Sequence, residues 1–326
     1  MLKAKIIATG SYLPEKIMRN SDLEKMVDTT DAWITDRTGI RERRIAARNQ
    51  SASDLAFEAS KMALRQADLK AKDLDLIIVA TITGDMPLPS TACLLQNLLD
   101  AKKAAAFDVN AACSGFLYAL SIADSFIRSG AHKRILVVGS EVLSKFTDWE
   151  DRGTCILFGD GAGAVILEAS NGDSGILSTH LYSDGSLWAL LNMPGGGSKN
   201  PPSKETLKEG LHTIKMKGNE TFKVAVRALE SLVTETLKAN KLKASQLAAL
   251  IPHQANLRII KATAERLGLP MDKVVLNLER YGNTSAASVP IALDEAARTG
   301  RIRTGDYILL EAFGGGLTWA SALVRW

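Results

Sequence analysis

The sequence is poor in cysteine. Only three of its 326 residues are cysteines (Cys93, Cys113 and Cys155), and they form no Cys-x-x-Cys pair and no zinc-type spacing with the four histidines. A sparse, odd set of this kind excludes a disulfide framework and a structural zinc site as the basis of the fold. We therefore expect no bound metal and no disulfide-stapled architecture.

Long apolar runs and a charge surplus are also lacking. No apolar run reaches the roughly 18 residues that span a bilayer, and residues 1–10 carry too short an apolar stretch for a signal peptide, predicting a first strand instead. The formal charge is +4, from 40 Lys+Arg against 36 Asp+Glu. We expect a cytoplasmic protein with neither membrane nor nucleic acid as partner, although a local basic patch can still dock an acidic protein.

Apolar, β-branched runs alternate instead with helical patterns, which predicts an α/β protein. At roughly 100–200 residues per domain, the length indicates two domains or one large duplicated unit. The predicted strands are 76–81, 106–109, 134–139, 164–167, 248–251, 274–278 and 307–310, and the predicted helices are 53–67, 114–129, 221–239, 257–267 and 285–299.

The order of predicted elements repeats in the two halves of the chain. Late in each half comes a helix that ends in glycine, and Asp124, Arg128 and Gly130 recur 170 residues later as Asp294, Arg298 and Gly300. We therefore divide the chain into an N-terminal half, 1–173, and a C-terminal half, 174–326. The same offset carries Cys113 onto Asn283, so the two are expected at equivalent strand-to-helix corners that meet at one site.

Cys113 is the candidate nucleophile. It lies in Asn110-Ala-Ala-Cys113-Ser-Gly115, between a predicted strand and a predicted helix. A thiol at a helix N-terminus is stabilised as thiolate, so we expect its pKa to fall below the usual value near 8.5. The alternative is a buried cysteine that fills a gap, the usual state of a free thiol. Cys93 and Cys155 are expected in the core.

Two further side chains follow strands of the second half. His253 stands in Ile251-Pro-His-Gln-Ala-Asn256, in a loop of the kind where open α/β sheets place ligands, although position alone is equally consistent with a surface histidine. Asn283 follows Gly282 and reads by itself as a turn with a helix N-cap. The run Phe313-Gly-Gly-Gly316 follows a strand and is either a hairpin turn or a source of backbone N–H groups for an oxyanion.

Taken together, the ordered motifs along the whole chain resemble the β-ketoacyl-[acyl-carrier-protein] synthase III family of bacterial fatty acid synthesis. The resemblance implies a thiolase-like fold of two duplicated βαβαβ halves, stacked as α-β-α-β-α layers. The segments that carry it are Trp33-Ile-Thr-Asp-Arg-Thr-Gly-Ile-Arg-Glu-Arg43, Asn110-Ala-Ala-Cys-Ser-Gly-Phe116, Asp151-Arg-Gly-Thr154, Leu157-Phe-Gly-Asp-Gly-Ala-Gly-Ala164, Gly218-Asn-Glu220, Pro252-His-Gln-Ala-Asn256, Gly282-Asn-Thr-Ser-Ala-Ala287 and Glu311-Ala-Phe-Gly-Gly-Gly316.

The resemblance implies that Cys113, His253 and Asn283 form a catalytic triad. Cys113 would take an acyl group from a short acyl-CoA primer, expected to be acetyl-CoA, with the oxyanion held by the backbone N–H groups of Cys113 and Gly316. His253 and Asn283 would stabilise the enolate formed when malonyl-acyl-carrier protein loses CO₂. Phe313 would shield the sulfur. Because CO₂ loss drives the condensation, no cofactor is implied.

The same resemblance implies the contacts with both substrates. Trp33 would stack on the adenine of coenzyme A, Arg37 and Arg152 would contact its nucleotide part, and Asn219 its pantetheine arm. The basic face that meets an acidic acyl carrier protein would include Lys223 and Arg258. Two lysines expected further along that face are Glu265 and Arg266 here, and Glu265 would repel such a partner.

A second departure concerns the primer. Where acetyl-preferring relatives carry a Phe that closes the acyl pocket across a homodimer, this chain has Leu88. The hypothesis is that primers longer than acetyl are accepted.

Three other classes of function stay open at this point. The first consists of enzymes that share the fold: hydroxymethylglutaryl-CoA synthase, chalcone-synthase-like enzymes and specialised quinolone- or polyketide-forming enzymes. A papain-like cysteine hydrolase also orders its residues Cys, His, Asn. A thiolase-fold binding module with an idle site is the non-enzymatic reading.

Overall fold

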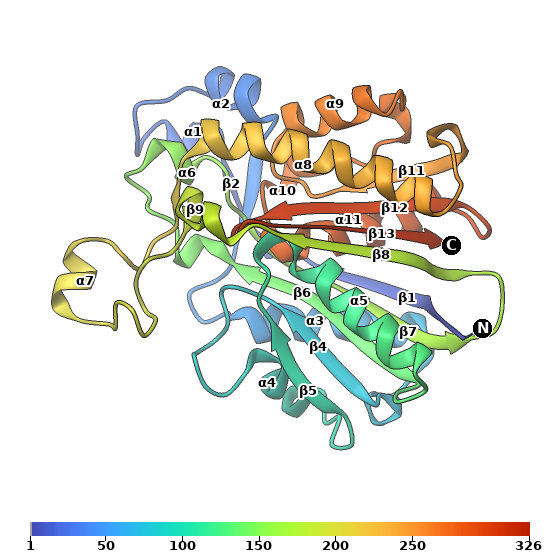
Figure 1. Cartoon of the computed structure of the whole chain (residues 1–326). Coiled ribbons are helices and arrows are strands. Elements are labelled where there is room, and N and C mark those ends of the chain that lie inside the picture. The colour runs from blue at the N-terminus through green and yellow to red at the C-terminus, as the bar shows by residue number, and fades with distance from the viewer. Residues whose placement is uncertain (1) are drawn as a thin grey trace.

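The chain folds into alternating layers of helix and sheet, seen edge-on in Figure 1. The computed structural model describes residues 2–326. In the first sheet β4 pairs in parallel with β5 and β6, whereas β7 runs antiparallel to β6 and β1. Its spatial order is β1-β7-β6-β4-β5, with β1 at Lys3–Tyr12, β4 at Leu76–Ala80, β5 at Ala105–Val109, β6 at Arg134–Val142 and β7 at Asp160–Ser170.

The second sheet repeats this arrangement with one strand fewer. β11 and β12 are parallel, and β13 runs antiparallel to β12 and β8. Its order is β11-β12-β13-β8, with β8 at Gly175–Ser183, β11 at Leu247–Pro252, β12 at Tyr307–Gly314 and β13 at Thr318–Arg325. Read from β8, the order matches the first sheet strand for strand up to β11, which confirms the two duplicated halves. The predicted boundary at 173/174 falls in the connection between β7 and β8, and the division into domains there stays a prediction.

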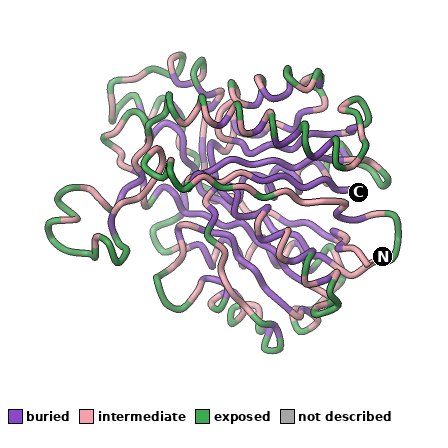
Figure 2. The backbone as a smooth tube through the Cα atoms, viewed as in Figure 1, coloured by how far each residue is buried: buried purple, intermediate pink, exposed green. Residues whose placement is uncertain are grey.

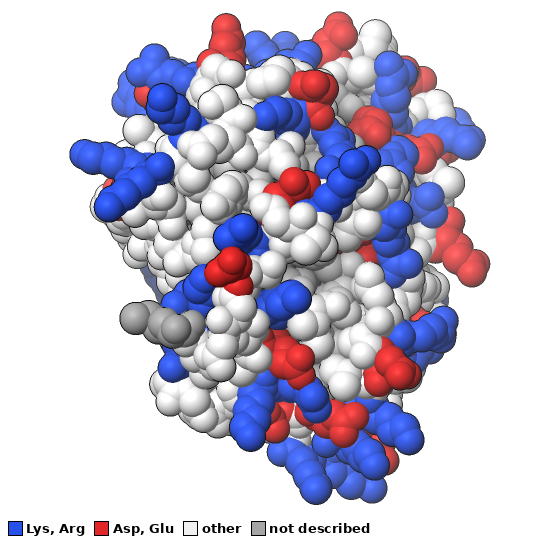
Figure 3. All heavy atoms as spheres, turned by 90° about the vertical axis from the view of Figure 1, so that its right-hand side faces the viewer, with Lys and Arg blue, Asp and Glu red and all other residues white. Residues whose placement is uncertain are grey.

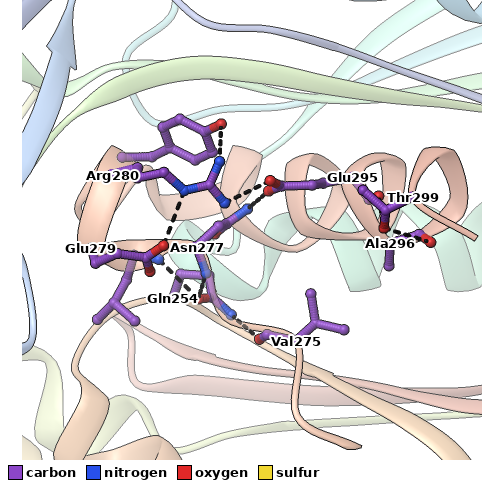
Figure 4. A network of polar contacts seen from close by, with 10 residues as sticks. Gln254, Val275, Asn277, Glu279, Arg280, Glu295, Ala296 and Thr299 are labelled. Atoms are coloured by element: carbon purple, nitrogen blue, oxygen red, sulfur yellow. Dashed lines mark hydrogen bonds and ion pairs between the residues drawn. The ribbon is translucent and has the colours of Figure 1, made fainter. Parts of the chain in front are cut away.

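The strand predicted over 274–278 is wrong. Only an isolated parallel bridge, Leu250 to Val274, stands where the fifth strand of the second sheet would lie, and α10 (Leu278–Tyr281) follows at once. The cause is a side chain. Gln254 accepts hydrogen bonds from the backbone N–H groups of Asn277 (2.9 Å) and Leu278 (3.2 Å) and donates to the carbonyl of Val275, so the segment needs no strand partner (Figure 4).

Helices α5 (Gly115–Arg128) and α11 (Ser288–Arg298) form the middle layer between the two sheets. Alternate residues of β4 face opposite layers: Leu76 and Ile78 pack with the middle helices, and Ile77 and Val79 with the outer ones. The outer layers are α3 (Ala52–Gln66) with α4 (Thr91–Leu98) on the first sheet, and α8 (Gly218–Ala239) with α9 (Leu257–Arg266) on the second. Both sheets are consequently buried along most of their length (Figure 2).

The repeat holds at the ends of the two middle helices but not at their starts. Arg128 pairs with Asp124 (2.6 Å) and Arg298 with Asp294 (2.8 Å), at the predicted offset of 170. At the starts, the two short 3₁₀ turns at Ala112–Ser114 and Ser285–Ala287 both begin with a non-glycine residue of positive φ, Ala112 at 46° and Ser285 at 47°. Their offset is 173 (285 − 112), because α11 is three residues shorter than α5.

The predicted equivalence of Cys113 and Asn283 is therefore wrong by three positions. By the geometry of the corners, Cys113 corresponds to Ala286, and Asn283 corresponds to Asn110. The predicted convergence of the two corners does not depend on that equivalence, because both lie on the middle layer where the halves pack together.

Short elements cluster at one end of the layers and build the surroundings of the corners. The short elements are β2 Lys16–Arg19, α1 Asn20–Leu23, α2 Asp31–Thr38, β3 Glu42–Ile45, α6 Arg152–Cys155, β9 Leu191–Asn192, α7 Lys204–Lys208 and β10 Lys215–Met216. A small arm that carries α7 extends from the rest of the molecule on the left of Figure 1.

Of the two cysteines expected in the core, only one lies there. Cys93 was expected in the core, but it lies near the start of α4 with its side chain exposed. Cys155 is buried as expected. It lies in the short helix α6, which is capped by the Asp151 carboxylate, an acceptor for Gly153 N (2.8 Å) and Thr154 Oγ1 (2.7 Å).

Charges of both signs are interspersed on the face shown in Figure 3, with uncharged surface between them. This distribution agrees with the small formal charge of +4. Over residues 2–326, no helix is both long enough and apolar enough to cross a bilayer.

Candidate active site

A pocket of about 630 Å³ brings together most of the predicted site residues. Its walls come from both halves of the chain and from the short elements at this end of the layers. The predicted residues that line it are Trp33, Arg37, Cys113, Asn219, Lys223, His253, Arg258, Asn283 and Phe313. Arg152, Leu88 and Gly316 are outside this lining.

Cys113 lies in the 3₁₀ turn just before α5, with 7% of its surface exposed. The corner is tied to the β12–β13 hairpin, because Ser114 Oγ donates to the carbonyl of Thr318 (3.1 Å) and Thr318 Oγ1 donates to that of Ala111 (2.8 Å). Gly314 lets the hairpin approach, since a Cβ at that position would lie 2.6 Å from the backbone nitrogen of Cys113. The sulfur is thus fixed by contacts across the two halves.

The expected fall in the pKa of Cys113 is wrong for this pocket. The pKa of the thiol is raised to about 12, chiefly by burial and to a lesser degree by the nearby Glu141 carboxylate, and a contact with the Ser285 hydroxyl offsets only part of the increase. Loss of solvation of a thiolate thus outweighs the favourable helix N-terminus. The resting group at neutral pH is a thiol.

His253 follows directly on the end of β11 and is 7% exposed, which is inconsistent with a surface histidine. Its backbone N–H donates to the carbonyl of Glu311 on β12 (2.8 Å), and its ring nitrogen Nδ1 lies 3.0 Å from Ser288 Oγ at the start of α11. Burial lowers the pKa of His253 to about 4, so the imidazole is neutral at pH 7.

Asn283 is held by its backbone on both sides. Its N–H donates to the carbonyl of Leu157 (2.8 Å) and its carbonyl accepts from Gly159 N (3.0 Å). Its side-chain Oδ1 accepts from the N–H of Ser285 (2.9 Å), the turn-like contact that the sequence alone suggested. With that oxygen engaged, the NH₂ group is the donor left for the pocket.

At the rim of the pocket, Trp33 on α2 is flanked by two guanidinium groups. Arg37 lies 4.5 Å and Arg152 4.8 Å from the centroid of the indole ring, both within cation–π range. Arg152 therefore belongs to the same cluster although it does not line the cavity itself. Lys223 on α8 and Arg258 on α9 are exposed at the same opening.

Comparison with known proteins identifies the family. A family model for 3-oxoacyl-[acyl-carrier-protein (ACP)] synthase III matches residues 107–185, and the model for its C-terminal part matches residues 237–326. The β-ketoacyl-[acyl-carrier-protein] synthase III of Caldanaerobacter subterraneus subsp. tengcongensis is 56% identical over 325 residues, which cover 100% of this chain and 98% of that protein. The chain belongs to the β-ketoacyl-[acyl-carrier-protein] synthase III family. It is thus an acyltransferase of the condensing type, and the papain-like hydrolase reading is wrong.

Other members of the synthase III family and their structural relatives agree. The β-ketoacyl-[acyl-carrier-protein] synthase III of Xanthomonas campestris pv. campestris is 58% identical, covering 99% of this chain and 98% of that protein. The crystal structure of 3-oxoacyl-[acyl-carrier-protein] synthase III from Aquifex aeolicus superposes with a TM-score of 0.93 at 52% identity, over 99% of this chain and 100% of the other. OleA from Xanthomonas campestris has a TM-score of 0.87 at 20% identity, which supports the thiolase-like fold alone.

Two buried carboxyl groups near this synthase III pocket were missed by the sequence analysis. Glu141 accepts from Thr83 Oγ1 (2.6 Å) and Thr81 Oγ1 (3.2 Å), and burial raises its pKa to about 7. Glu311, beside His253, has no hydrogen-bond partner within residues 2–326 for either carboxyl oxygen, and burial raises its pKa to about 8. The available signal was an acidic residue inside an otherwise apolar strand, which is rare unless it has a specific role.

Two predicted residues stand apart from the cavity. Leu88 lies in the loop between β4 and α4 with 84% of its surface exposed. Gly316 lies in the β12–β13 hairpin with φ of +136°, a conformation that favours glycine. The roles given to both stay predictions.

Proposed function

We propose that the chain condenses a short acyl-CoA primer with malonyl-acyl-carrier protein through an acyl intermediate on Cys113. The observation that carries the proposal is the single pocket lined by Cys113, His253 and Asn283, which come from three separate segments of the chain. The product is a β-ketoacyl-acyl-carrier protein, and the reaction starts a fatty acid.

The first half-reaction is transfer of the acyl group. The sulfur of Cys113 attacks the thioester carbonyl of the acyl-CoA, and backbone N–H groups of Cys113 and Gly316 stabilise the oxyanion. The C–S bond to coenzyme A then breaks. Because the resting thiol is protonated, its proton leaves with the coenzyme A, which departs as a free thiol.

The second half-reaction uses the two donors from the other half of the chain. Malonyl-carrier protein loses CO₂, and the electron pair of the broken C–C bond forms an enolate on the thioester. His253 Nε2 and Asn283 Nδ2 donate hydrogen bonds to the enolate oxygen, and the enolate carbon then attacks the acyl carbonyl on Cys113. The C–S bond to Cys113 breaks, and the released sulfur takes up a proton to return to the resting thiol. A neutral imidazole fits this role, and burial keeps His253 neutral. Loss of CO₂ drives the reaction, so no metal or redox cofactor is required.

Phe313 is proposed to shield the sulfur. Its side chain is 7% exposed, lines the pocket, and stacks at 6.4 Å on the ring of Trp319 in the neighbouring strand. A fixed apolar ring beside the thiol disfavours a charged malonate carboxylate in that part of the cavity.

The rim is proposed to bind coenzyme A. Trp33 stacks on the adenine while Arg37 and Arg152 contact the nucleotide, and Asn219, which lines the pocket, bonds the pantetheine arm. The two guanidinium groups that already cover the indole ring support this arrangement, since one of them has only to move aside to admit the base.

Lys223 and Arg258 are proposed to meet the acidic carrier protein at the mouth of the pocket. Further along this face, Arg266 is engaged by Glu230 (2.6 Å), and Glu265 adds a negative charge. The docking surface is therefore expected to concentrate near the opening and not to extend along α9.

The protein is proposed to act as a homodimer in the cytoplasm. β5 ends the first sheet with an open edge, and the exposed apolar side chains of Met86, Leu88 and Leu98 lie on neighbouring segments. A second copy paired along β5 would cover them and bring Leu88 to the partner's acyl pocket.

This chain has Leu88 where acetyl-preferring relatives carry a Phe. We therefore predict that primers longer than acetyl are accepted.

The test is intact-protein mass spectrometry after incubation with equal amounts of acetyl-, butyryl- and isobutyryl-CoA. We expect one acyl adduct per chain, mapped to Cys113, and comparable kcat/KM for the three primers. Absence of any adduct would contradict the acyl-enzyme proposal, whereas an adduct with about a hundredfold preference for acetyl would contradict only the role of Leu88. Condensation with malonyl-carrier protein but not malonyl-CoA separates this activity from specialised relatives that use the free thioester.

A further inference from the structure

The second nitrogen of the His253 ring has a defined partner. Nδ1 lies 3.0 Å from the hydroxyl oxygen of Ser288, the first residue of α11. Both residues are buried, with 7% of His253 and 1% of Ser288 exposed. Water therefore has little access to this contact, and the hydrogen-bonding of the ring is decided by protein groups.

One lone pair of the Ser288 oxygen is already used. The backbone N–H of Gln254 donates to Ser288 Oγ at 2.7 Å. A hydroxyl has one hydrogen to donate and two lone pairs to accept with. Ser288 can therefore accept a second hydrogen bond from His253 Nδ1–H, or it can donate its own hydrogen to an unprotonated Nδ1.

The second arrangement satisfies every polar atom. Over residues 2–326, Gln254 N and His253 Nδ1 are the only hydrogen-bond partners of Ser288 Oγ. If Nδ1 carried the proton, the serine hydrogen would be buried without an acceptor, which costs free energy. If the serine donates to Nδ1, both contacts are made, and the proton of the neutral ring resides on Nε2.

We propose that Ser288 is a positioning residue that holds His253 in the Nε2–H tautomer. The inference deepens the proposed function, in which Nε2 donates to the enolate oxygen. Asn283 is arranged in the same way as His253. Its Oδ1 accepts a hydrogen bond from Ser285 N, which leaves its NH₂ group as the donor for the pocket. In both side chains the accepting atom is occupied by residues around the start of α11, so that each presents a donor.

The backbone around the pair is held firmly enough for this contact to matter. Gln254, next to His253, donates to the carbonyls of Pro252 (2.8 Å) and Val275 (3.0 Å), and it also accepts the N–H groups of the following segment (Figure 4). The backbone of His253 is thus fixed at the end of β11, and its ring points to Ser288 at the start of α11. Rotation of the ring away from Ser288 would cost the Nδ1 contact without a replacement.

The direct test is nitrogen NMR of the enzyme with ¹⁵N-labelled histidine. The chain has only four histidines, and a His253→Gln variant assigns the signals of His253. At pH 7 we expect Nε2 protonated and Nδ1 unprotonated in the wild type. A wild-type ring protonated at Nδ1 overturns the proposal, and this readout needs no substitution at Ser288.

Two substitutions separate this role from a merely structural one. Ser288→Ala should shift the tautomer toward Nδ1–H, spare acyl transfer from CoA to Cys113, and slow condensation about ten- to a hundredfold. Ser288→Thr keeps the hydroxyl and should restore the Nε2–H tautomer with most of the condensation rate. The matched control is Ser60→Ala, which removes a buried hydroxyl bonded to the carbonyl of Ala56 in α3 and should change neither readout.

The outcomes also distinguish this proposal from the proposed function. An unchanged tautomer in Ser288→Ala overturns the positioning role of Ser288. If His253→Ala instead retains full condensation, the proposed role of His253 fails, while the tautomer of the wild-type ring still tests the inference about Ser288.

Discussion

The two strand-to-helix corners are built alike and packed against each other's half. The corner of the first half, at Cys113, rests on Gly314 in β12 of the second sheet, where a Cβ would lie 2.6 Å from Cys113 N. The corner of the second half, at Ala286, rests on Gly139 in β6 of the first sheet, where a Cβ would lie 2.2 Å from the carbonyl oxygen of Ala286. The contact is reciprocal, as expected when two copies of one unit pack face to face.

The chemistry at the two corners is not alike. The first corner offers a thiol at the position where the second has Ala286, and the second offers Asn283, with His253 and Ser288 close by. The two corners of the duplicated fold thus have different roles in the proposed reaction: one supplies the nucleophile, and the other supplies neutral hydrogen-bond donors. The following variants test this division.

The largest effect is expected at the first corner. Cys113→Ser should lower acyl transfer from acyl-CoA on the order of a thousandfold or more, because a buried serine hydroxyl is a far weaker nucleophile than a thiol. Loading is measured as the acyl adduct by mass spectrometry. Full loading of the variant on another residue would remove Cys113 from its role.

The opposite pattern is expected at the second corner. Asn283→Ala should leave loading within about threefold and slow decarboxylation and condensation about a hundred- to a thousandfold, because one donor to the enolate is lost. The two steps are measured separately, by adduct formation and by release of CO₂ from malonyl-carrier protein. The matched variant is Asn110→Ala, at the equivalent position of the first half, and a similar loss of condensation in that variant would break the proposed division.

Substitution of Gly314 or Gly139, on which the two corners pack, should lower the free energy of unfolding similarly but slow different half-reactions. Gly314→Ala and Gly139→Ala should each lower the free energy of unfolding by about 1–3 kcal/mol, since each added methyl meets backbone atoms. Gly314→Ala should slow loading more than decarboxylation, because it displaces Cys113, and Gly139→Ala should do the reverse. Denaturant unfolding and the two half-reactions measure these effects, and identical kinetic defects in the two variants would contradict the assignment.

The last effect concerns stability alone and is expected from Glu311, which lies in β12, whereas the other buried glutamate, Glu141, lies in the equivalent strand β6. Burial raises its pKa from 4.5 to about 8, so between these values the folded protein holds a proton that the unfolded chain has released. Its contribution to stability is therefore greatest below pH 4.5 and falls as the pH rises to about 8. Glu311→Gln should remove this fall, so the Tm difference between variant and wild type should grow from pH 5 to pH 8. A constant difference would contradict the raised pKa.

Much of the fold follows from local patterns. The alternation of apolar runs and amphipathic segments predicts most central strands and helices, and the Asp-Arg-Gly repeat at the ends of the middle helices predicts the duplication. The resemblance to the family adds the residues that meet in the pocket. These features are set by side-chain periodicity and by motifs, which the sequence contains directly.

Other features depend on distant contacts. The three-residue slip between the corners is hidden, because the identical residues lie at the helix ends and the difference lies at the starts. The missing fifth strand depends on Gln254, whose amide reaches across to Asn277 and Leu278. The raised pKa of Cys113 depends on how completely both halves enclose the sulfur, which no local pattern around Cys113 reveals.

The division of labour between the corners is tested most directly by a single-turnover experiment followed by mass spectrometry. The enzyme is first mixed with acetyl-CoA and then with malonyl-carrier protein, for the wild type and for Asn283→Ala. We predict that an acetyl group appears on Cys113 in both proteins, and that only the wild type then transfers it rapidly to give acetoacetyl-carrier protein. Condensation without an adduct on Cys113, or equally fast discharge in the variant, would contradict the account.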